Sequence, residues 1–454
     1  MSPNSPTAMG FGTRRQFLQT TGLGALGLFW ANWCRASETQ AASHQAKAKS
    51  VILIFNCGAP SHTDLWDMKP KAPENIRGLF KPIATNVPGI QISELMPKLA
   101  RQADRLAIVR SVHHTQTQHN TGMYYSIVGK PYRIDSTLIN PSRTDYPSFG
   151  TLVGWLARRD GYSSPLPPYV ITPFPHCDST VYVTPGQYGG CLGARYDPLV
   201  LNADPNMPNF RVPNLSLSED LSAARLQERQ SLLGHLDEHT GFGSAARFAD
   251  LDLNRSKAID LVTSNTVQKA FDLSLEPPAV RDRYGRHSWG QSHLLARRLV
   301  EAGVRFVTTV NGPSIIWDTH ADNFCRLKTK LAPPMESGFA ALLDDLHERG
   351  LLHSTLVIWM GDFGRTPTIN KDAGRDHWPQ CYTMVLAGGG IRGGQYIGSS
   401  DPHGAYPKEY PITPADVHAT VFTAMGYDPH GISYLSPEGR PFPLSDGQPI
   451  RGLL

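Results

Sequence analysis

The strongest constraint on the fold is a short apolar run that ends abruptly in a glycine and an acid. Residues 356–359 read Leu-Val-Ile-Trp, a stretch typical of a buried strand. Gly361 and Asp362 follow almost at once, so the Asp362 carboxylate would project beyond the end of the strand. Open α/β sheets bind their ligands at this edge. His377 follows in a glycine-rich setting, and an imidazole beside a carboxylate there suits a divalent metal.

The same alternation of strand, loop and helix recurs along the chain. Further strands are expected at 51–55, 105–110, 169–172, 304–310 and 383–386, and helices at 94–103, 292–302 and 336–349. Repeated units of this kind favour an α/β fold with a mostly parallel central sheet flanked by helices. Two stretches interrupt the alternation: a loop-rich insertion at about 130–215, where we place substrate specificity, and a helical insertion at about 216–285.

The first 42 residues have the pattern of a twin-arginine signal peptide. Arg14 and Arg15 precede an apolar, glycine-rich stretch at 22–33 and small residues at 41–43. This apolar stretch is shorter than the roughly 20 residues that a membrane span needs. We therefore expect a mature domain at 43–454 without a stable membrane span after processing. The twin-arginine machinery would export it to a periplasmic or extracellular location.

Charge and cysteine content exclude several classes of function. The chain has 43 lysines and arginines against 39 acids, with no basic stripe, which argues against nucleic-acid binding. Loss of Cys34 with the signal peptide would leave an odd number of the six cysteines, and no C-x-x-C motif is present. This pattern argues against a disulfide framework and a thiolate zinc site. A pairing of Cys177 with Cys191 stays open.

Acids and histidines follow three of the expected strands. They are Ser61, His62 and Asp64 after the first strand, Asp318 and His320 after 304–310, and Asp362 with the later His377. Any one group could simply cap the next element. Three groups at successive strand ends predict a shared centre for a divalent metal, which could be Zn, Mn, Mg or Ca.

Together with this pattern, five strings in the chain resemble a known family. The strings lie at 58–64, 317–320, 361–367, 374–379 and 413–419. They resemble the DUF1501 family of exported, sulfatase-like proteins, a distant branch of the alkaline phosphatase superfamily. The resemblance covers nearly the whole mature chain and implies an alkaline phosphatase-like domain at 43–454.

The superfamily resemblance implies two divalent metals at the carboxyl edge of the sheet. It places Asp318, His320 and His377 together on one metal. Asp362 resembles a ligand of the second metal, but Phe363 stands where the superfamily has a histidine. His62, Asp64 or a residue near His119 would have to replace that ligand.

The resemblance leaves the nucleophile open. His119 aligns with the nucleophile of the superfamily, Thr121 lies close by, and Ser61 is the other candidate. A formylglycine mechanism is disfavoured, because the segment that begins at Cys57 lacks the expected arginine. Arg365 could clamp an anionic oxygen, or it could form a structural ion pair.

These features predict an exported metal-dependent hydrolase of sulfate or phosphate esters, acting on a small molecule or a polysaccharide. The alternative is a catalytically inactive, sulfatase-like binding protein, so whether the chain is an enzyme stays open. A phosphomutase-like transferase fits less well, because export would remove it from most phosphosugars.

Overall fold

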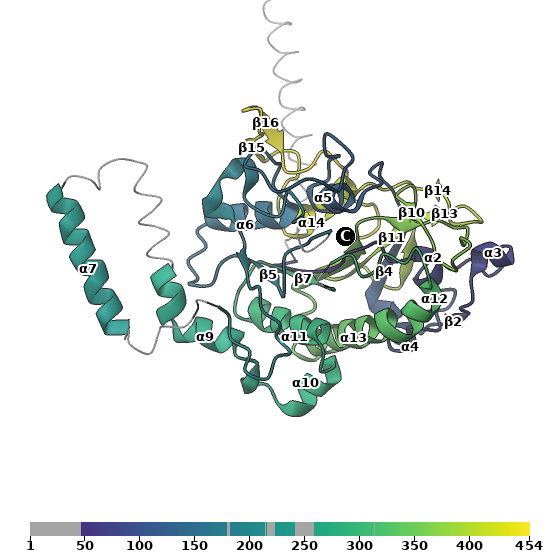
Figure 1. Ribbon diagram of the computed structural model, residues 1–454, viewed down its shortest axis with the longest axis horizontal. Helices are drawn as coiled ribbons and strands as arrows, with labels where there is room; N and C mark the ends of the chain where they lie inside the picture. The colour runs from purple at the N-terminus through teal and green to yellow at the C-terminus, as the bar shows by residue number, and fades with distance from the viewer. Residues whose placement is uncertain (1–46, 179–181, 214, 216–222, 241–257, 313) are drawn as a thin grey trace, which may run out of the picture. The chain divides into compact units, whose positions relative to one another are not determined.

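The computed structural model describes residues 47–178, 182–213, 215, 223–240, 258–312 and 314–454 (Figure 1). The predicted signal peptide at 1–42 lies outside these residues, as do parts of the predicted helical insertion. Within the described part of the chain, no helix is long and apolar enough to cross a membrane.

An eight-stranded sheet forms the centre of the fold, in the order β12-β4-β11-β8-β1-β7-β5-β6. Its strands are β1 (Ser50–Asn56), β4 (Leu106–Val112), β5 (Tyr169–Thr172), β6 (Leu199–Val200), β7 (Phe306–Val310), β8 (Thr355–Gly361), β11 (Tyr382–Gly388) and β12 (Gln395–Ile397). Among them, β11 runs antiparallel to its neighbours β4 and β8, and the other pairs are parallel. The predicted mostly parallel sheet is confirmed.

The side chains of β1 show why this sheet needs a cover on both faces. Val51, Leu53 and Phe55 enter one apolar core, whereas Ile52 and Ile54 enter another, because successive side chains of a strand point to opposite faces. Two layers of helices cover these cores (Figure 1). They are α11 (Ser288–Glu301) and α13 (Ala332–Glu348) on the Ile52 face, and α5 (His119–Val128), α6 (Phe149–Arg159) and α14 (Pro414–Ala424) on the other.

Most of the predicted strands and helices are found with shifted ends. The helices predicted at 292–302 and 336–349 are α11 and α13, and each begins four residues earlier. The helix predicted at 94–103 was too long, since α4 spans only Pro97–Ala100 before a separate turn at Ala103–Arg105. Pro97 accounts for the late start, because proline is favoured in the first turn of a helix and disfavoured in its interior.

The two interruptions contain regular elements of their own. The first supplies α6 and the strands β5 and β6 to the main fold. The second is helical where it is described, with α7 (Ala223–Thr240), α9 (Asn265–Phe271) and α10 (Pro278–Tyr284). The remaining short elements are α2 (His62–Leu65), α3 (Glu74–Arg77), α12 (Asn323–Arg326), β2 (Pro82–Ala84), β3 (Gln91–Ser93), β9 (Gly364–Arg365), β10 (His377–Trp378), β13 (Ser399–Ser400), β14 (Pro407–Glu409), β15 (Ser433–Leu435) and β16 (Pro441–Pro443).

The strand directions bring distant segments to one edge of the sheet. The strands β1, β7 and β8 are parallel, so the loops after them leave at the same edge. Strand β4 points the same way, because both it and β8 are antiparallel to β11. For the same reason β11 begins at this edge, which places the residues before it, including His377, beside the three loops.

Candidate metal centre

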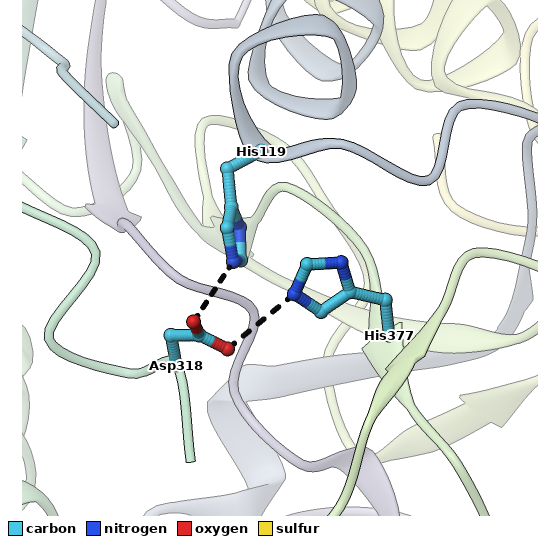
Figure 2. A group of neighbouring side chains, drawn as sticks. All are labelled: His119, Asp318 and His377. Carbon is cyan, nitrogen blue, oxygen red and sulfur yellow. Dashed lines mark ion pairs between the residues drawn. The ribbon is translucent and has the colours of Figure 1, made fainter. Parts of the chain in front are cut away.

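Asp318 lies between histidines that come from distant parts of the chain. Its Oδ2 is 3.4 Å from His119 Nε2, and its Oδ1 is 3.4 Å from His377 Nε2 (Figure 2). Ligand atoms of these three residues all lie within 4.8 Å of one another. His320 Nε2 is 3.1 Å from Asp318 Oδ1 and 3.0 Å from His377 Nε2. We call His119, Asp318, His320 and His377 the His–Asp cluster.

Each member of the cluster is placed by the backbone around it. His119 is the first residue of α5, and His377 opens β10, where it pairs with Arg365 of β9. The loop after β7 that carries Asp318 packs tightly on the loop after β1. A Cβ at Gly58 would come within 2.6 Å of the Asp318 backbone nitrogen, and the φ of Gly58 is +103°. Glycine is therefore required at this close approach.

The three imidazoles are held by their Nδ1 atoms in the same way. His377 Nδ1 donates to the Thr117 carbonyl at 2.7 Å, and His320 Nδ1 contacts Asp376 Oδ1 at 2.6 Å. His119 Nδ1 contacts the Asp362 carboxylate. Because these partners are hydrogen-bond acceptors, each Nδ1 carries the hydrogen. In its neutral form each ring directs its Nε2 lone pair into the cluster, as metal-binding histidines do.

The facing nitrogen atoms provide a test of whether a metal fits. Two Nε2 lone pairs only 3.0 Å apart, on His320 and His377, would repel each other unless a positive charge lies close to both. His119 Nε2 is buried and has no hydrogen-bond partner among the described residues. A divalent cation would satisfy these atoms and Asp318 together. Three imidazoles and one carboxylate favour zinc or manganese over magnesium or calcium, which prefer oxygen ligands.

The charges at the cluster also favour a cation. Burial raises the pKa of Asp318, but His119, His377 and Arg365 outweigh burial and hold this pKa far below its usual range. Burial lowers the pKa of His119, but Asp362 and Asp318 outweigh it and raise the pKa to about 9. Both carboxylates therefore stabilise a positive charge at His119, which a proton or a metal ion can supply.

Asp362 and Phe363, which follow β8, surround His119 rather than facing the centre of the cluster. Asp362 Oδ1 accepts hydrogen bonds from the backbone N–H groups of Gly58 at 3.1 Å and Ala59 at 2.6 Å, and its Oδ2 contacts His119. The Phe363 ring stacks on the His119 ring, with centroids 5.0 Å apart. Asp362 thus contacts both His119 and the loop after β1, and Phe363 packs on the His119 ring. Asp362 as a metal ligand stays a prediction.

Ser61 and Asp64 lie in a separate buried network. Asp64 forms a two-pronged ion pair with Arg375, at 2.7 Å from Nε and 2.9 Å from a terminal nitrogen. Asp64 Oδ2 also accepts from Asn323 at 2.9 Å and from Ser61 Oγ at 2.6 Å. We call this network the Arg375–Asp64 pair. The structure does not bring Ser61 or Asp64 into the His–Asp cluster.

The other predicted site residues are also bonded to protein groups. His62 Nε2 lies 2.8 Å from the Gly404 carbonyl, and burial lowers the pKa of His62. Thr121 Oγ1 donates to Asp135 Oδ1 at 2.5 Å. Arg365 is fully buried and pairs with Asp318 Oδ1 at 2.5 Å, so it reaches the cluster as a structural partner.

Sequence reasoning grouped Asp318, His320 and His377, and the structure brings these three together. It did not place His119 with them, and it missed the contacts of Asp376 with His320 and of the Thr117 carbonyl with His377. Asp376 directly precedes His377, which is a usable signal. The Thr117 contact uses a backbone carbonyl, which any residue has, so the sequence contains no signal for it.

The chain was compared with protein families and with curated protein sequences. A family profile described as "Protein of unknown function (DUF1501)" matches residues 48–454. No curated protein sequence matches the chain.

Several solved structures share a weak overall similarity. The protein Ps i-CgsB in complex with k-i-k-neocarrahexaose is 13% identical with a TM-score of 0.40, over 88% of this chain and 75% of that one. A protein in the alkaline phosphatase superfamily from Vibrio parahaemolyticus is 11% identical with a TM-score of 0.38, over 85% and 68%. The phosphonate monoester hydrolase SpPMH from Silicibacter pomeroyi is 12% identical with a TM-score of 0.37, over 90% and 76%.

Proposed function

The chain belongs to the DUF1501 family, and we propose that it is an exported, metal-dependent hydrolase of sulfate or phosphate esters. The observation that carries this proposal is the His–Asp cluster. Three imidazoles, each fixed through Nδ1, direct their Nε2 atoms toward one carboxylate. Of these atoms, His119 Nε2 is buried and has no hydrogen-bond partner among the described residues, and a metal ion would supply one.

A divalent cation held by the cluster would act as a Lewis acid on an oxygen of the ester. The chain's own groups prepare the site for this chemistry. Asp362, Asp376 and the Thr117 carbonyl fix the imidazoles, which limits rearrangement when a ligand binds. Phe363 keeps water from the ring face of His119.

Substrate would approach from the side of His320. The side chains of His320 and Asp376 are 46% and 52% exposed, whereas that of His119 is only 3% exposed. The ester would therefore meet the cluster between His320 and His377, with His119 at the back of the site.

We propose that water is the attacking group. The hydroxyl candidates Ser61 and Thr121 are buried and donate to Asp64 and Asp135, away from the cluster. Water would add to sulfur or phosphorus as the bond to the ester oxygen breaks. The alcohol would then leave with one proton of that water, and the sulfate or phosphate product would keep the other.

The same engaged hydroxyls support a second candidate, a sulfatase-like binding protein that holds a metal without catalysis. Under both proposals the twin-arginine segment directs export to the periplasm or beyond, and the ligand is a small ester or a polysaccharide bearing such esters. Mass spectrometry of the protein recovered after export tests the first point. A retained N-terminus would contradict processing near residue 42.

The experiment that separates the two candidates combines metal analysis with ester hydrolysis. We expect the purified protein to bind zinc or manganese and to cleave aryl sulfate or aryl phosphate esters only when loaded. His377→Ala should lose most of the metal, whereas His347→Ala, an exposed histidine of α13, should keep it. Metal binding without hydrolysis of any ester would favour the binding protein, and absence of metal binding would contradict both.

A further inference from the structure

The three imidazoles of the His–Asp cluster do not have the same kind of partner at Nδ1. Two of them contact an aspartate carboxylate. His377 Nδ1 instead donates to the backbone carbonyl of Thr117, at 2.7 Å. A carboxylate raises the basicity of an imidazole more than a neutral carbonyl does, because its hydrogen bond is charge-assisted. His377 would therefore be the weakest of the three ligands unless a negative charge acts on it in another way.

The peptide group between Thr117 and Gln118 connects His377 to a further carboxylate. Its C=O accepts from His377, and its N–H, which belongs to Gln118, donates to Asp135 Oδ1 at 3.1 Å. This peptide bond is trans, so its C=O and its N–H point in opposite directions. His377 and Asp135 thus lie at opposite ends of one peptide group. Hydrogen bonds in such a chain polarise one another, so the charge of Asp135 strengthens the hydrogen bond that His377 donates.

Further hydrogen bonds fix Asp135 in this position. Its Oδ2 accepts from the Thr117 N–H at 2.8 Å and from Thr117 Oγ1 at 2.6 Å, and its Oδ1 also accepts from Thr121 Oγ1 at 2.5 Å. Burial raises the pKa of Asp135, but the two hydroxyls and the N–H groups of Thr117 and Gln118 outweigh burial and hold this pKa below its usual range. Asp135 is therefore a charged carboxylate at neutral pH.

These contacts are not those of an ordinary helix cap. A capping side chain accepts from N–H groups inside the first turn of a helix, whereas Asp135 accepts from those of Thr117 and Gln118, which precede α5. Gln118 is the N-cap residue of α5, and its own side chain makes no capping hydrogen bond. Asp135 therefore fixes the turn that leads into α5, and this turn carries the carbonyl that holds His377.

We infer that Asp135 is a positioning residue of the metal centre, which orients and polarises His377 through the peptide group between Thr117 and Gln118. Each imidazole of the cluster then has one aspartate behind it, two in direct contact and one through a peptide group. This inference rests on the metal centre of the proposed function and does not depend on which ester is cleaved. It gives the loop after α5, at the start of the predicted loop-rich insertion, a role in metal binding.

Zinc affinity of the full chain, measured by competition with a chelating dye, provides the first test. Asp135→Asn keeps the shape of the side chain but removes its charge, and should weaken zinc binding by about threefold to tenfold, less than loss of a direct partner. Asp135→Ala also removes the hydrogen bonds and should weaken it by about 10–100-fold. The control Asp272→Asn alters a carboxylate that likewise accepts from an N–H and a hydroxyl, both of Ser274, and should change nothing.

A spectroscopic measurement separates polarisation of His377 from a merely structural role. In zinc-loaded protein labelled with ¹⁵N-histidine, the Nδ1–H signal of His377 is identified by its through-space contact with Thr117. In Asp135→Asn this signal should move upfield, because a less polarised carbonyl accepts a weaker hydrogen bond. The Nδ1–H signals of His119 and His320 should keep their positions. A general loosening of the fold would move all three signals together.

The outcomes separate this inference from the proposed function. If the unaltered protein bound no zinc, both would be overturned. If it bound zinc, and Asp135→Asn matched Asp272→Asn in affinity, the role of Asp135 would be overturned and the metal centre would stand. The same holds if the His377 signal stayed in place in Asp135→Asn, or moved together with the other two.

Discussion

The His–Asp cluster and the Arg375–Asp64 pair resemble each other in sequence and differ in structure. Each has an aspartate two residues from a histidine at the same edge of the sheet, His62 with Asp64 in α2 and Asp318 with His320 in the loop after β7. Asp64 accepts hydrogen bonds from an arginine, an amide and a hydroxyl and is fully buried. Asp318 pairs with Arg365 and also lies beside the Nε2 atoms of three imidazoles, and its side chain is 19% exposed.

The presence of an aspartate near a histidine does not by itself make a metal site. The hydrogen-bond donors around the carboxylate decide whether it can bind a metal. Arginine, amide and hydroxyl donors give Asp64 four hydrogen bonds, three of them to Oδ2, so this carboxylate is already engaged by protein groups. Imidazole rings fixed through Nδ1 bring lone pairs of their own to Asp318. The first arrangement stabilises the fold, and the second is suited to bind a cation.

The largest expected difference between the two regions is in stability, when Arg375 is replaced. Arg375→Met should lower the free energy of unfolding by about 3–5 kcal/mol, because it leaves the Asp64 carboxylate buried and unpaired. Urea unfolding followed by circular dichroism measures this loss. The folded fraction should still bind metal with unchanged stoichiometry.

A double variant provides the matched control. Asp64→Leu combined with Arg375→Met removes both charges and should recover much of the lost stability. If Arg375→Met alone lowered the free energy of unfolding by less than about 1 kcal/mol, the Arg375–Asp64 pair would not be an important contributor to stability.

The next effect is a loss of metal affinity when a residue that holds a histidine of the cluster is replaced. Asp376→Asn should weaken metal affinity by about 10–100-fold, because it removes the carboxylate that holds His320. Stability should change by less than about 0.5 kcal/mol, since Asp376 is exposed. Competition with a chelating dye measures the affinity, and Asp372→Asn, a neighbouring exposed acid, serves as control. Equal affinities for both variants would remove Asp376 from the site.

The last effect is a dependence of metal affinity on pH. A metal must displace the proton from His119, whose neighbouring carboxylates raise its pKa to about 9 despite burial. Metal affinity should therefore rise about tenfold per pH unit up to about pH 9 and then level off. Calorimetry at several pH values measures this slope, and a flat profile between neutral pH and about pH 9 would contradict it.

The same pKa shift has a consequence for the stability of protein kept free of metal. Because the folded-state pKa of His119 lies above its ordinary value of 6.5, its protonation stabilises the fold. That stabilisation is fully present below about pH 6.5 and is lost as the pH rises through about 9. His62, whose pKa is lowered by burial, makes no such contribution at alkaline pH.

Much of the fold could be predicted because the sheet is buried on both faces. Strands such as β1 and β8 are then continuous apolar runs, which can be recognised in the sequence without knowing which strands they pair with. The ends of helices were less accurate. The start of α11 depends on the His287 side chain, which accepts a hydrogen bond from the Gly290 N–H, and an apolar pattern does not reveal such a cap.

The His–Asp cluster was predictable only where its members lie close in sequence or in a recognised string. Asp318 and His320 are two residues apart, and a recognised string contains His377. Asp64 was grouped with the ligands because its partner Arg375 is 311 residues away. His119 was assigned to the nucleophile position, since no sequence pattern shows which way its Nε2 points.

The most direct test of the account is a crystal structure of the protein grown with zinc and measured at the zinc absorption edge. We predict one strong anomalous peak bonded to Asp318 and to the Nε2 atoms of His119, His320 and His377, at about 2.0–2.2 Å from each. A peak at His62 and Asp64 instead, or no peak near Asp318, would contradict the His–Asp cluster as the metal centre.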